Sequence, residues 1–585
     1  MKKIFLFVLT IGLFAGCSKS FLNTQPLTEK TNSSFYLTDA DFQQALTATY
    51  HALVEVPSVA GSILNVYPFV ISELMSDERF GGGGDNDLDP KAISEFTITG
   101  PDLFRGAWSR AYTGIFRANM IIASIDGGKF SSADVKGQVE GEALFLRAMY
   151  YFDLSRMFGD VPLITEAAPM NIPRTPAAKV YAQIATDLKT AISVFPATPY
   201  SASTYDLMGH ANKWCAEALM ARVFLFYTGY YETTTLPLND GTSSIASTDV
   251  VAWLEDCITN SGYQLMPDFR ALWPYAIEQA PYSDSTYNYV KVNNVPVWYG
   301  EKGGNFETMF ALKFSTFANW STTIYYSNQM DLFFGWRNYD FHAYGGFVGD
   351  GWGMGTVNKT LWDAWDDSDI RKKASIMDVT DPDEAVSAIY TLDGSDPHDK
   401  QMDETGYWQK KYRPVNVYKK AIKDWHNYSI DMWGISTKNF QLDNTQDIVL
   451  LRFADVLLMH SEISQTVDGI NKVRERVGLP DIGTYTLAAL QNERRFELAF
   501  EGERYYDLLR WAGKSNIASL QPIFDAENGV TTMNNGVWGQ MKGVDFRPIT
   551  GGFVQIPNTE IALSQGILVQ NPGWETGTAP VFSYK

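Results

Sequence analysis

The chain has few of the residues that build disulfide frameworks and metal centres. Its 585 residues include three cysteines and six histidines. Three cysteines exclude a disulfide-rich scaffold, and the histidines form no HExxH pair, the helical signature of zinc proteases. Cys215 and Cys257 both lie in apolar helical patterns, which favours buried thiols. One disulfide between these two residues in an oxidising compartment stays open as an alternative.

Long apolar runs are also missing from most of the chain. No segment beyond the N-terminus has about 18 uninterrupted apolar residues. The nearest, residues 447–460, contains Arg452 and Asp455. The N-terminus differs, because Lys2 and Lys3 precede an apolar run over residues 4–15, a pattern typical of a secretory signal peptide. This run is shorter than the roughly 20 residues that span a bilayer.

The end of this apolar run indicates how the mature chain begins. The sequence "LFAGC" at residues 13–17 resembles the lipobox of bacterial lipoproteins, in which the signal peptide is removed before a cysteine that becomes lipidated. We therefore expect residues 1–16 to be a lipoprotein signal peptide and Cys17 to carry acyl chains that tether the protein to a membrane. The alternative is a secreted protein without an anchor.

Positive charge is scarce relative to negative charge. The chain has 47 Lys and Arg residues against 67 Asp and Glu residues, a formal net charge of -20. Loss of Lys2 and Lys3 with the signal peptide makes the mature chain more negative still. An acidic surface repels phosphate groups, so nucleic acids and anionic lipid surfaces are excluded as partners.

Most of the chain outside its middle third has helical periodicity. A long apolar-striped segment, a short loop and a second such segment follow one another repeatedly, which is typical of tetratricopeptide-like helix pairs. The predicted fold is therefore mostly α, a helical-repeat scaffold with a large irregular insertion. The expected helices cover residues 38–56, with Thr38 as a cap, 101–125, 135–159, 177–195, 210–231, 248–265, 448–464, 468–478 and 492–512.

Helical periodicity fades between residues 266 and 448, where Gly, Asp, Asn, Tyr and Trp accumulate. A stretch of this length with little regular structure is often functional. We therefore divide the chain into the signal peptide (1–16), an N-terminal helical scaffold (17–265), a loop-rich ligand-binding insertion (266–448), and a C-terminal helical region with its tail (449–585).

The insertion is rich in aromatic residues. Twelve of the 36 residues from 317 to 352 are aromatic. Sugars have apolar C–H faces and hydroxyl rims, so aromatic rings flanked by polar side chains match both of their surfaces. The alternative is that many of these rings only pack the insertion together. The residues that we expect to bind a glycan are Trp298, Trp320, Trp336 and Tyr344 by stacking, and Asn319, Arg337, Asp340 and, from an N-terminal loop, Asp77 by hydrogen bonds.

The segment "NERRFELAFEGERYYDLLRWAGKS", residues 492–515, combines carboxylates with arginines. Its ending is not a phosphate-binding loop, because Leu508 stands where the motif needs a glycine. On a helix, Glu493, Glu497 and Glu501 would share one side, as a glycosidase acid–base pair could. Arginines at i,i+3 spacing favour ion pairing instead, and paired carboxylates make poor general acids. With no GxSxG motif either, we expect no enzymatic activity and no cofactor.

Three alternating aspartates, Asp85, Asp87 and Asp89, resemble the start of a calcium loop. Pro90 replaces the required glycine, and Phe96 stands where the bidentate glutamate is needed. A flexible acidic loop is therefore favoured, and a weak cation site stays open.

Several long motifs resemble the SusD/RagB family of Bacteroidetes outer-membrane lipoproteins. They are "LLRFADVLLMHSEI", "INKVRERVGLP", "NERRFELAFEGERYYDLLRW" and the tail "FVQIPNTEIALSQGILVQNPGW". The start "CSKSFLNTQP" resembles the family's N-terminus, with Asn23 in place of an acid. The run from His460 to Ile463 also departs from the family, where Ala-Glu-Ala is usual. The resemblance covers essentially the whole mature chain.

This resemblance implies a fold and a function. SusD-like proteins have a tetratricopeptide-like scaffold with an irregular ligand-binding subdomain. They are lipid-anchored at the outer membrane, lie as a lid on a SusC-like TonB-dependent transporter, and pass oligosaccharides or polysaccharides to it. Because the ligand residues of the family vary with the glycan, the resemblance assigns none here. A peptide-binding or structural lid subunit and a glycoside hydrolase are the alternatives.

Overall fold

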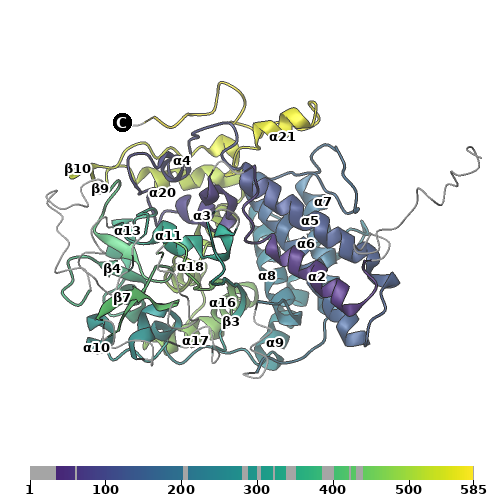
Figure 1. The fold of residues 1–585 in the computed structure, drawn as a ribbon, viewed down its shortest axis with the longest axis horizontal. Helices are drawn as coiled ribbons and strands as arrows, with labels where there is room; N and C mark the ends of the chain where they lie inside the picture. Colours follow the sequence, from purple (N-terminus) through teal and green to yellow (C-terminus); the bar gives the residue numbers. More distant parts are fainter. Residues whose placement is uncertain are drawn as a thin grey trace, which may run out of the picture.

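The structure is a computed structural model (Figure 1). It describes residues 35–59, 62–201, 209–279, 287–298, 305–320, 323–337, 349, 351–384, 401–419, 423–429, 439 and 441–583. The predictions for the signal peptide, Cys17, Asp340 and Tyr344 lie outside these residues. Within them, no helix combines the length and apolar character needed to cross a bilayer.

The N-terminal third is built from helices that pack against their successors in the chain. The helix α2 begins at the predicted cap, because Thr38 accepts a hydrogen bond from the Asp41 amide while the Asp41 carboxylate accepts one from Thr38. Close helix contacts need small residues: a Cβ on Gly114 of α5 would lie 2.2 Å from the Tyr150 ring of α6. The elements are α2 (Asp39–His51), α3 (Pro68–Leu74), α4 (Leu88–Ser94), α5 (Arg105–Ser124), α6 (Ala133–Phe158), α7 (Ala177–Val194), α8 (Lys213–Tyr230), α9 (Ser247–Asn260) and the short pair β1 (Leu236–Pro237) with β2 (Ser244–Ile245).

The C-terminal helices complete this scaffold instead of forming a separate unit. Helix α16 packs against α8 and α9 (Figure 1). Helix α19 also packs against α8. One hydrophobic cluster runs from Ala52 to Trp574 and includes residues of all three predicted regions. The elements are α16 (Phe453–Ser464), α17 (Asp468–Arg476), α18 (Leu487–Glu497), α19 (Arg504–Ala512), α20 (Gln521–Asp525), α21 (Asn558–Leu563) and the hairpin β9 (Thr531–Asn534) with β10 (Val537–Gln540).

The described part of the insertion contains only short elements. Strand β3 pairs antiparallel with β8, which closes the insertion at its base. The elements are α10 (Asn288–Val292), β3 (Thr308–Leu312), α11 (Gln329–Phe334), α13 (Lys359–Ala364), α14 (Ile370–Ser375), β4 (Ile376–Asp378) with β5 (Tyr407–Gln409), β6 (Asn416–Lys419) with β7 (Asp424–Asn427), and β8 (Ile448–Arg452).

Short 3₁₀ turns occur in the scaffold and in the insertion. They are η1 (Ile63–Val66), η2 (Ile125–Gly127), η4 (Phe269–Leu272), η5 (Pro274–Gln279), η6 (Ile324–Tyr326), η8 (Lys514–Leu520) and η9 (Pro548–Thr550).

Two helix predictions are wrong in part. Residues 448–452 form β8, and the helix begins only at Phe453, because an apolar run fits a buried strand as well as a helix. The predicted helix over 492–512 breaks into α18 and α19. Phe500 and Gly502 between them have φ values of 68° and 81°, which a helix does not accept. Glu501 therefore lies in the turn after α18 and does not continue the helix that carries Glu493 and Glu497.

Candidate functional site

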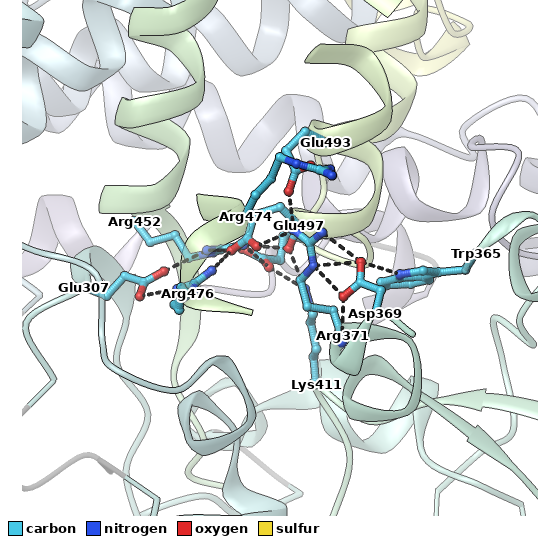
Figure 2. Close-up of polar contacts among 11 residues, drawn as sticks. Glu307, Trp365, Asp369, Arg371, Lys411, Arg452, Arg474, Arg476, Glu493 and Glu497 are labelled. Carbon is cyan, nitrogen blue, oxygen red and sulfur yellow. Dashed lines mark hydrogen bonds and ion pairs between the residues drawn. The ribbon is translucent and has the colours of Figure 1, made fainter. Parts of the chain in front are cut away.

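A buried ion-pair network joins the insertion to the scaffold (Figure 2). Arg452, the last residue of β8, is at its centre. Its Nη1 lies 2.8 Å from Glu307 Oε1 and 2.5 Å from Glu497 Oε1, and its Nε lies 2.7 Å from Glu501 Oε2. Lys411 of the insertion also reaches Glu501, with 2.6 Å between Nζ and Oε1. The carboxylates that looked most catalytic thus hold the base of the insertion.

Arg371 extends the same network toward α18. Its guanidinium contacts Asp369 at 2.7 Å, Glu493 at 2.6 Å and Glu497 at 2.9 Å. The Trp365 indole donates a hydrogen bond to Asp369 over 3.0 Å, which fixes that carboxylate in turn (Figure 2). Two segments that are distant in sequence, residues 365–371 and α18, therefore meet around one guanidinium.

This pairing sets the protonation state of the central carboxylate. Burial alone would raise the pKa of Glu497, but Arg476, Arg452 and Arg371 together hold it well below its usual range. Glu497 therefore stays ionised and cannot serve as a general acid near neutral pH. Of the predicted i,i+3 pairs, Asp507–Arg510 forms at 2.8 Å. The pair Arg494–Glu497 is replaced by contacts with other segments, such as Arg494 with Asp455 at 2.6 Å. The pair Glu501–Arg504 does not form, and the chain turns between these two residues.

The Gly-Lys-Ser ending is not an anion site in the structure. Gly513 ends α19 with a φ of 75°, and the Ser515 amide donates to Glu232 Oε2 over 2.9 Å. A carboxylate therefore already occupies the position that a phosphate would take.

Asp77 lies in the scaffold, where it bridges two arginines. Its carboxylate is 2.7 Å from Arg504 Nε and 3.0 Å from Arg495 Nη2. Burial would raise the pKa of Asp77, but the two arginines lower it well below its ordinary value. With its side chain buried and doubly paired, Asp77 has no surface to offer a glycan in this structure.

The predicted tryptophans differ in what they expose. Trp336 is 2% exposed, so its ring belongs to the core. Its backbone carbonyl accepts a hydrogen bond from the Gly351 backbone amide. Trp298 is half-buried, with its indole donating to the Leu272 carbonyl and its ring edge-on to Tyr428. Neither ring presents a fully open face, whereas Trp320 is 48% exposed.

Arg337 lies beside the acidic loop that follows α3. Its Nη1 contacts Asp87 Oδ2 at 3.1 Å and the Trp352 carbonyl at 3.3 Å. The Gly84 amide donates to the same aspartate oxygen over 2.7 Å, and Thr99 donates to Asp89. The loop is thus braced by side-chain contacts. Among the residues that the structure describes, no group of three His, Cys, Asp or Glu side chains could hold a metal ion.

Among the residues of the insertion that the structure describes, the aromatic side chains with the largest exposed fractions lie on a single loop. Phe317 is 76% exposed and Trp320 48%, with Asn319 exposed between them. We call these three residues the aromatic platform. Thr323 braces the loop. Its hydroxyl donates to the Phe317 carbonyl over 2.7 Å and accepts a hydrogen bond from the side-chain amide of Asn319 over 2.6 Å. Two of the predicted residues, the neighbours Asn319 and Trp320, are thus both exposed on this loop.

Two residues, one in the platform and one close to its loop, were not selected from the sequence. Phe317 was one of many aromatics, with no signal that set it apart. His51, at the end of α2, packs edge-on against Tyr325 with 4.8 Å between ring centroids. Its distance in sequence from the insertion leaves no pattern that could have predicted this contact.

Comparison with known proteins identifies the architecture. A protein-family model described as "SusD family" matches residues 296–574. A second family model, described as "Starch-binding associating with outer membrane", matches residues 21–225. The chain belongs to the SusD/RagB family. A SusD-like protein P2 of Formosa agariphila is 24% identical over 97% of this chain and 99% of its own, and a SusD-like protein of Bacteroides ovatus is 25% identical over 87% and 82%.

Solved structures of SusD-like proteins share this fold. A laminarin-binding SusD-like protein matches with a TM-score of 0.65 at 23% identity, over 92% of this chain and all of its own. A surface glycan-binding protein A from Bacteroides thetaiotaomicron, in complex with laminarihexaose, matches with a TM-score of 0.65 at 19% identity, over 91% of this chain and 99% of its own. The helical scaffold predicted from the sequence is therefore confirmed as a SusD-like fold.

Proposed function

We propose that this SusD-like chain is a non-catalytic lipoprotein that captures oligosaccharides or polysaccharides at the cell surface and delivers them to a SusC-like TonB-dependent transporter. The observation that carries the proposal is the aromatic platform, where two large rings and an amide are exposed on a braced loop. Exposed aromatic faces stack on the C–H faces of sugars, and amides bond to their hydroxyls.

The platform defines the centre of the proposed site. Phe317 and Trp320 supply the stacking faces and Asn319 the hydrogen bonds. Trp298 and Arg337 are proposed as peripheral contacts, since each is partly exposed. Tyr344 and Asp340 are kept from the sequence prediction. Trp336 and Asp77 are reassigned as supporting residues because they are buried.

The proposal of a binding protein without catalysis rests on the carboxylates of α18. Glu497 and Glu493 are buried in ion pairs with arginines, and a glycosidase needs an accessible pair, one of which holds a proton. Incubation of the purified protein with a polysaccharide panel tests this point. We expect no release of reducing ends, and reproducible release would overturn the assignment.

Affinity electrophoresis in native gels tests the platform itself. Because laminarin and laminarihexaose appear in the names of structural neighbours, laminarin is the first probe of the panel. We expect Phe317→Ala and Trp320→Ala to reduce the retardation by the retained polysaccharide at least fivefold. The matched control is Trp538→Ala on β10, a tryptophan of similar exposure (40%) outside the platform. If Phe317→Ala and Trp320→Ala are retarded as strongly as the wild type and the Trp538→Ala control, the platform is refuted.

The membrane attachment is proposed through Cys17. In its bacterial host, the wild-type chain should fractionate with the outer membrane and be accessible to extracellular protease. Cys17→Ala should release the chain from the membrane. Membrane retention of this variant would show that Cys17 is not the anchor.

One observation favours the alternative of a peptide-binding or structural lid subunit. A groove of about 500 Å³ lies between α5, residues 162–172 and α21, and is lined mainly by apolar side chains. Phe116, Met170 and Leu563 on its walls are exposed, as in grooves that accept apolar peptide segments. Failure to bind any glycan of the panel, together with co-purification of an identified TonB-dependent transporter, would favour this function.

A further inference from the structure

A second cavity lies in the helical scaffold itself. It has a volume of about 470 Å³ and lies between α2, the first half of α6 and the segment that leads into α8. This volume is within the range of small-molecule sites. Polar side chains stand among the apolar surface of its walls: Gln43, Gln138, Glu142, His210, Asn212 and Tyr263.

A buried carboxylate and a histidine form the polar wall of this cavity. Glu142 is 1% exposed, and its Oε2 lies 2.8 Å from His210 Nδ1. The Gln138 amide donates to Glu142 Oε1 over 2.7 Å and to the Ala211 carbonyl over 2.9 Å. Burying a carboxylate is costly unless its hydrogen bonds are satisfied. These bonds fix the wall before any ligand arrives, which lowers the entropic cost of binding.

The position of the cavity relates it to the aromatic platform. Tyr50 of α2 contacts the His210 ring at 5.3 Å between centroids, and its hydroxyl accepts from the Ala211 amide over 2.8 Å. The next residue, His51, contacts Tyr325 in the loop that carries the platform. Consecutive residues at one end of α2 therefore touch the cavity on one side and the platform loop on the other.

The charges around the cavity restrict its ligand. Asp134 and Glu142 line it, and His210 is the one basic group among its described lining residues, so anionic ligands are repelled. Val135, Pro196 and Met309 add apolar wall against which C–H groups can pack. Hydroxyl groups can both donate to carboxylates and accept from amides or an imidazole. We propose that this cavity is a second carbohydrate subsite, which takes one or two neutral sugar units; its ligand class rests on the proposed glycan-binding function.

Cavity-filling variants test this subsite without removing a buried group. Gln43 lines the cavity and Gln44 does not, and both are exposed on α2. Gln43→Trp should therefore block the cavity, while Gln44→Trp makes the same chemical change beside it. Thr198→Trp, at another exposed lining residue, is a second blocking variant. Thermal unfolding of each variant verifies that the fold is intact.

Binding is measured by saturation-transfer difference NMR with neutral probes: glucose, N-acetylglucosamine, maltose, cellobiose and laminaribiose. We expect the wild type and Gln44→Trp to bind at least one probe, and Gln43→Trp and Thr198→Trp to bind it at least tenfold more weakly. A uronic-acid disaccharide should bind more weakly than the best neutral probe. No binding of any probe to the wild type, or unchanged binding by both blocking variants, would overturn the subsite.

The two sites are distinguished by a double variant. Phe317→Ala with Trp320→Ala should lose polysaccharide retardation but keep the NMR signal of the small sugar. If this double variant loses the small-sugar signal while both blocking variants keep it, the sugar binds at the platform and the subsite is refuted, with the proposed function intact. If the double variant loses only retardation and both blocking variants still bind the small sugar normally, the subsite is refuted as well.

Discussion

Asp77 and Arg504 are 427 residues apart in sequence and 2.7 Å apart in the structure, measured from Oδ1 to Nε. Arg495 reaches the same carboxylate from α18. The segment after α3 is thereby fixed to the two helices that carry the family's longest motif. This contact explains why an aspartate in that segment is structural.

Asp77→Asn should destabilise the fold without changing glycan binding. The change leaves two partly buried arginines without their shared carboxylate, which costs about 3 kcal/mol of unfolding free energy. Urea unfolding followed by fluorescence measures this loss. Asp126→Asn is the control, since Asp126 is exposed and its pair with Lys136 is screened by solvent and contributes little to stability. Loss of glycan binding at unchanged stability would restore the direct ligand role that the sequence predicted.

Trp336→Ala and Trp320→Ala should separate packing from binding. Trp336 is buried, so removal of its ring leaves a cavity and costs about 3–5 kcal/mol of unfolding free energy. Trp320 is exposed, so its removal should change stability by less than about 0.5 kcal/mol. Parallel urea unfolding and native-gel retardation measure both properties. A Trp336→Ala variant as stable as the wild type would contradict the burial of this ring.

Glu497 makes stability depend on acid pH. The arginines hold its folded-state pKa well below its unfolded-state value of about 4.3, against the opposing effect of burial. Its contribution is therefore fully present above pH of about 4.3 and is lost as pH falls toward the folded-state pKa. Glu497→Gln should lower stability at pH 7 by about 3–5 kcal/mol and make the decline between pH 5 and pH 3 shallower. Urea unfolding at several pH values gives both quantities, and parallel curves for the two proteins would contradict the prediction.

Cys215 and Cys257 are both free and buried in the structure. Burial raises the pKa of Cys215 to about 12 and raises that of Cys257 as well, so neither forms a reactive thiolate at neutral pH. A chromogenic thiol reagent should therefore react with neither in the native protein and with both in urea. Two thiols that appear only after reduction would show the disulfide that the sequence left open.

The scaffold could be predicted closely because it depends on local patterns. The periodicity of residues 177–195 gave α7 to within one residue, and Thr38 signalled the start of α2. Failures occurred where distant partners decide the structure. Residues 448–452 become a strand because β3 pairs with them, and the turn at Phe500 and Gly502 packs against Phe69, far upstream.

The candidate site was harder to predict than the scaffold. Trp320 and Trp336 lie in the same aromatic segment with similar neighbours, yet one is half exposed and the other is core. The backbone around Trp336 is held by hydrogen bonds from residues 351–354 to residues 332–336, segments that no local pattern pairs. Composition located the aromatic surface, but exposure depends on tertiary packing that no local pattern records.

The pairing of β3 with β8 has a consequence for how such chains diversify. Both ends of the segment from residue 313 to residue 447 leave the scaffold at adjacent points, clamped by Glu307 and Arg452. The entropy of closing a loop grows only slowly with its length, about 0.6 kcal/mol for each doubling. Insertions and deletions in those loops of the segment that leave the buried contacts of Arg371 and Lys411 intact therefore change stability little as long as its two ends stay joined. If this segment carries the proposed glycan site, changes in its loops can alter ligand preference while the helices that surround it keep their sequence.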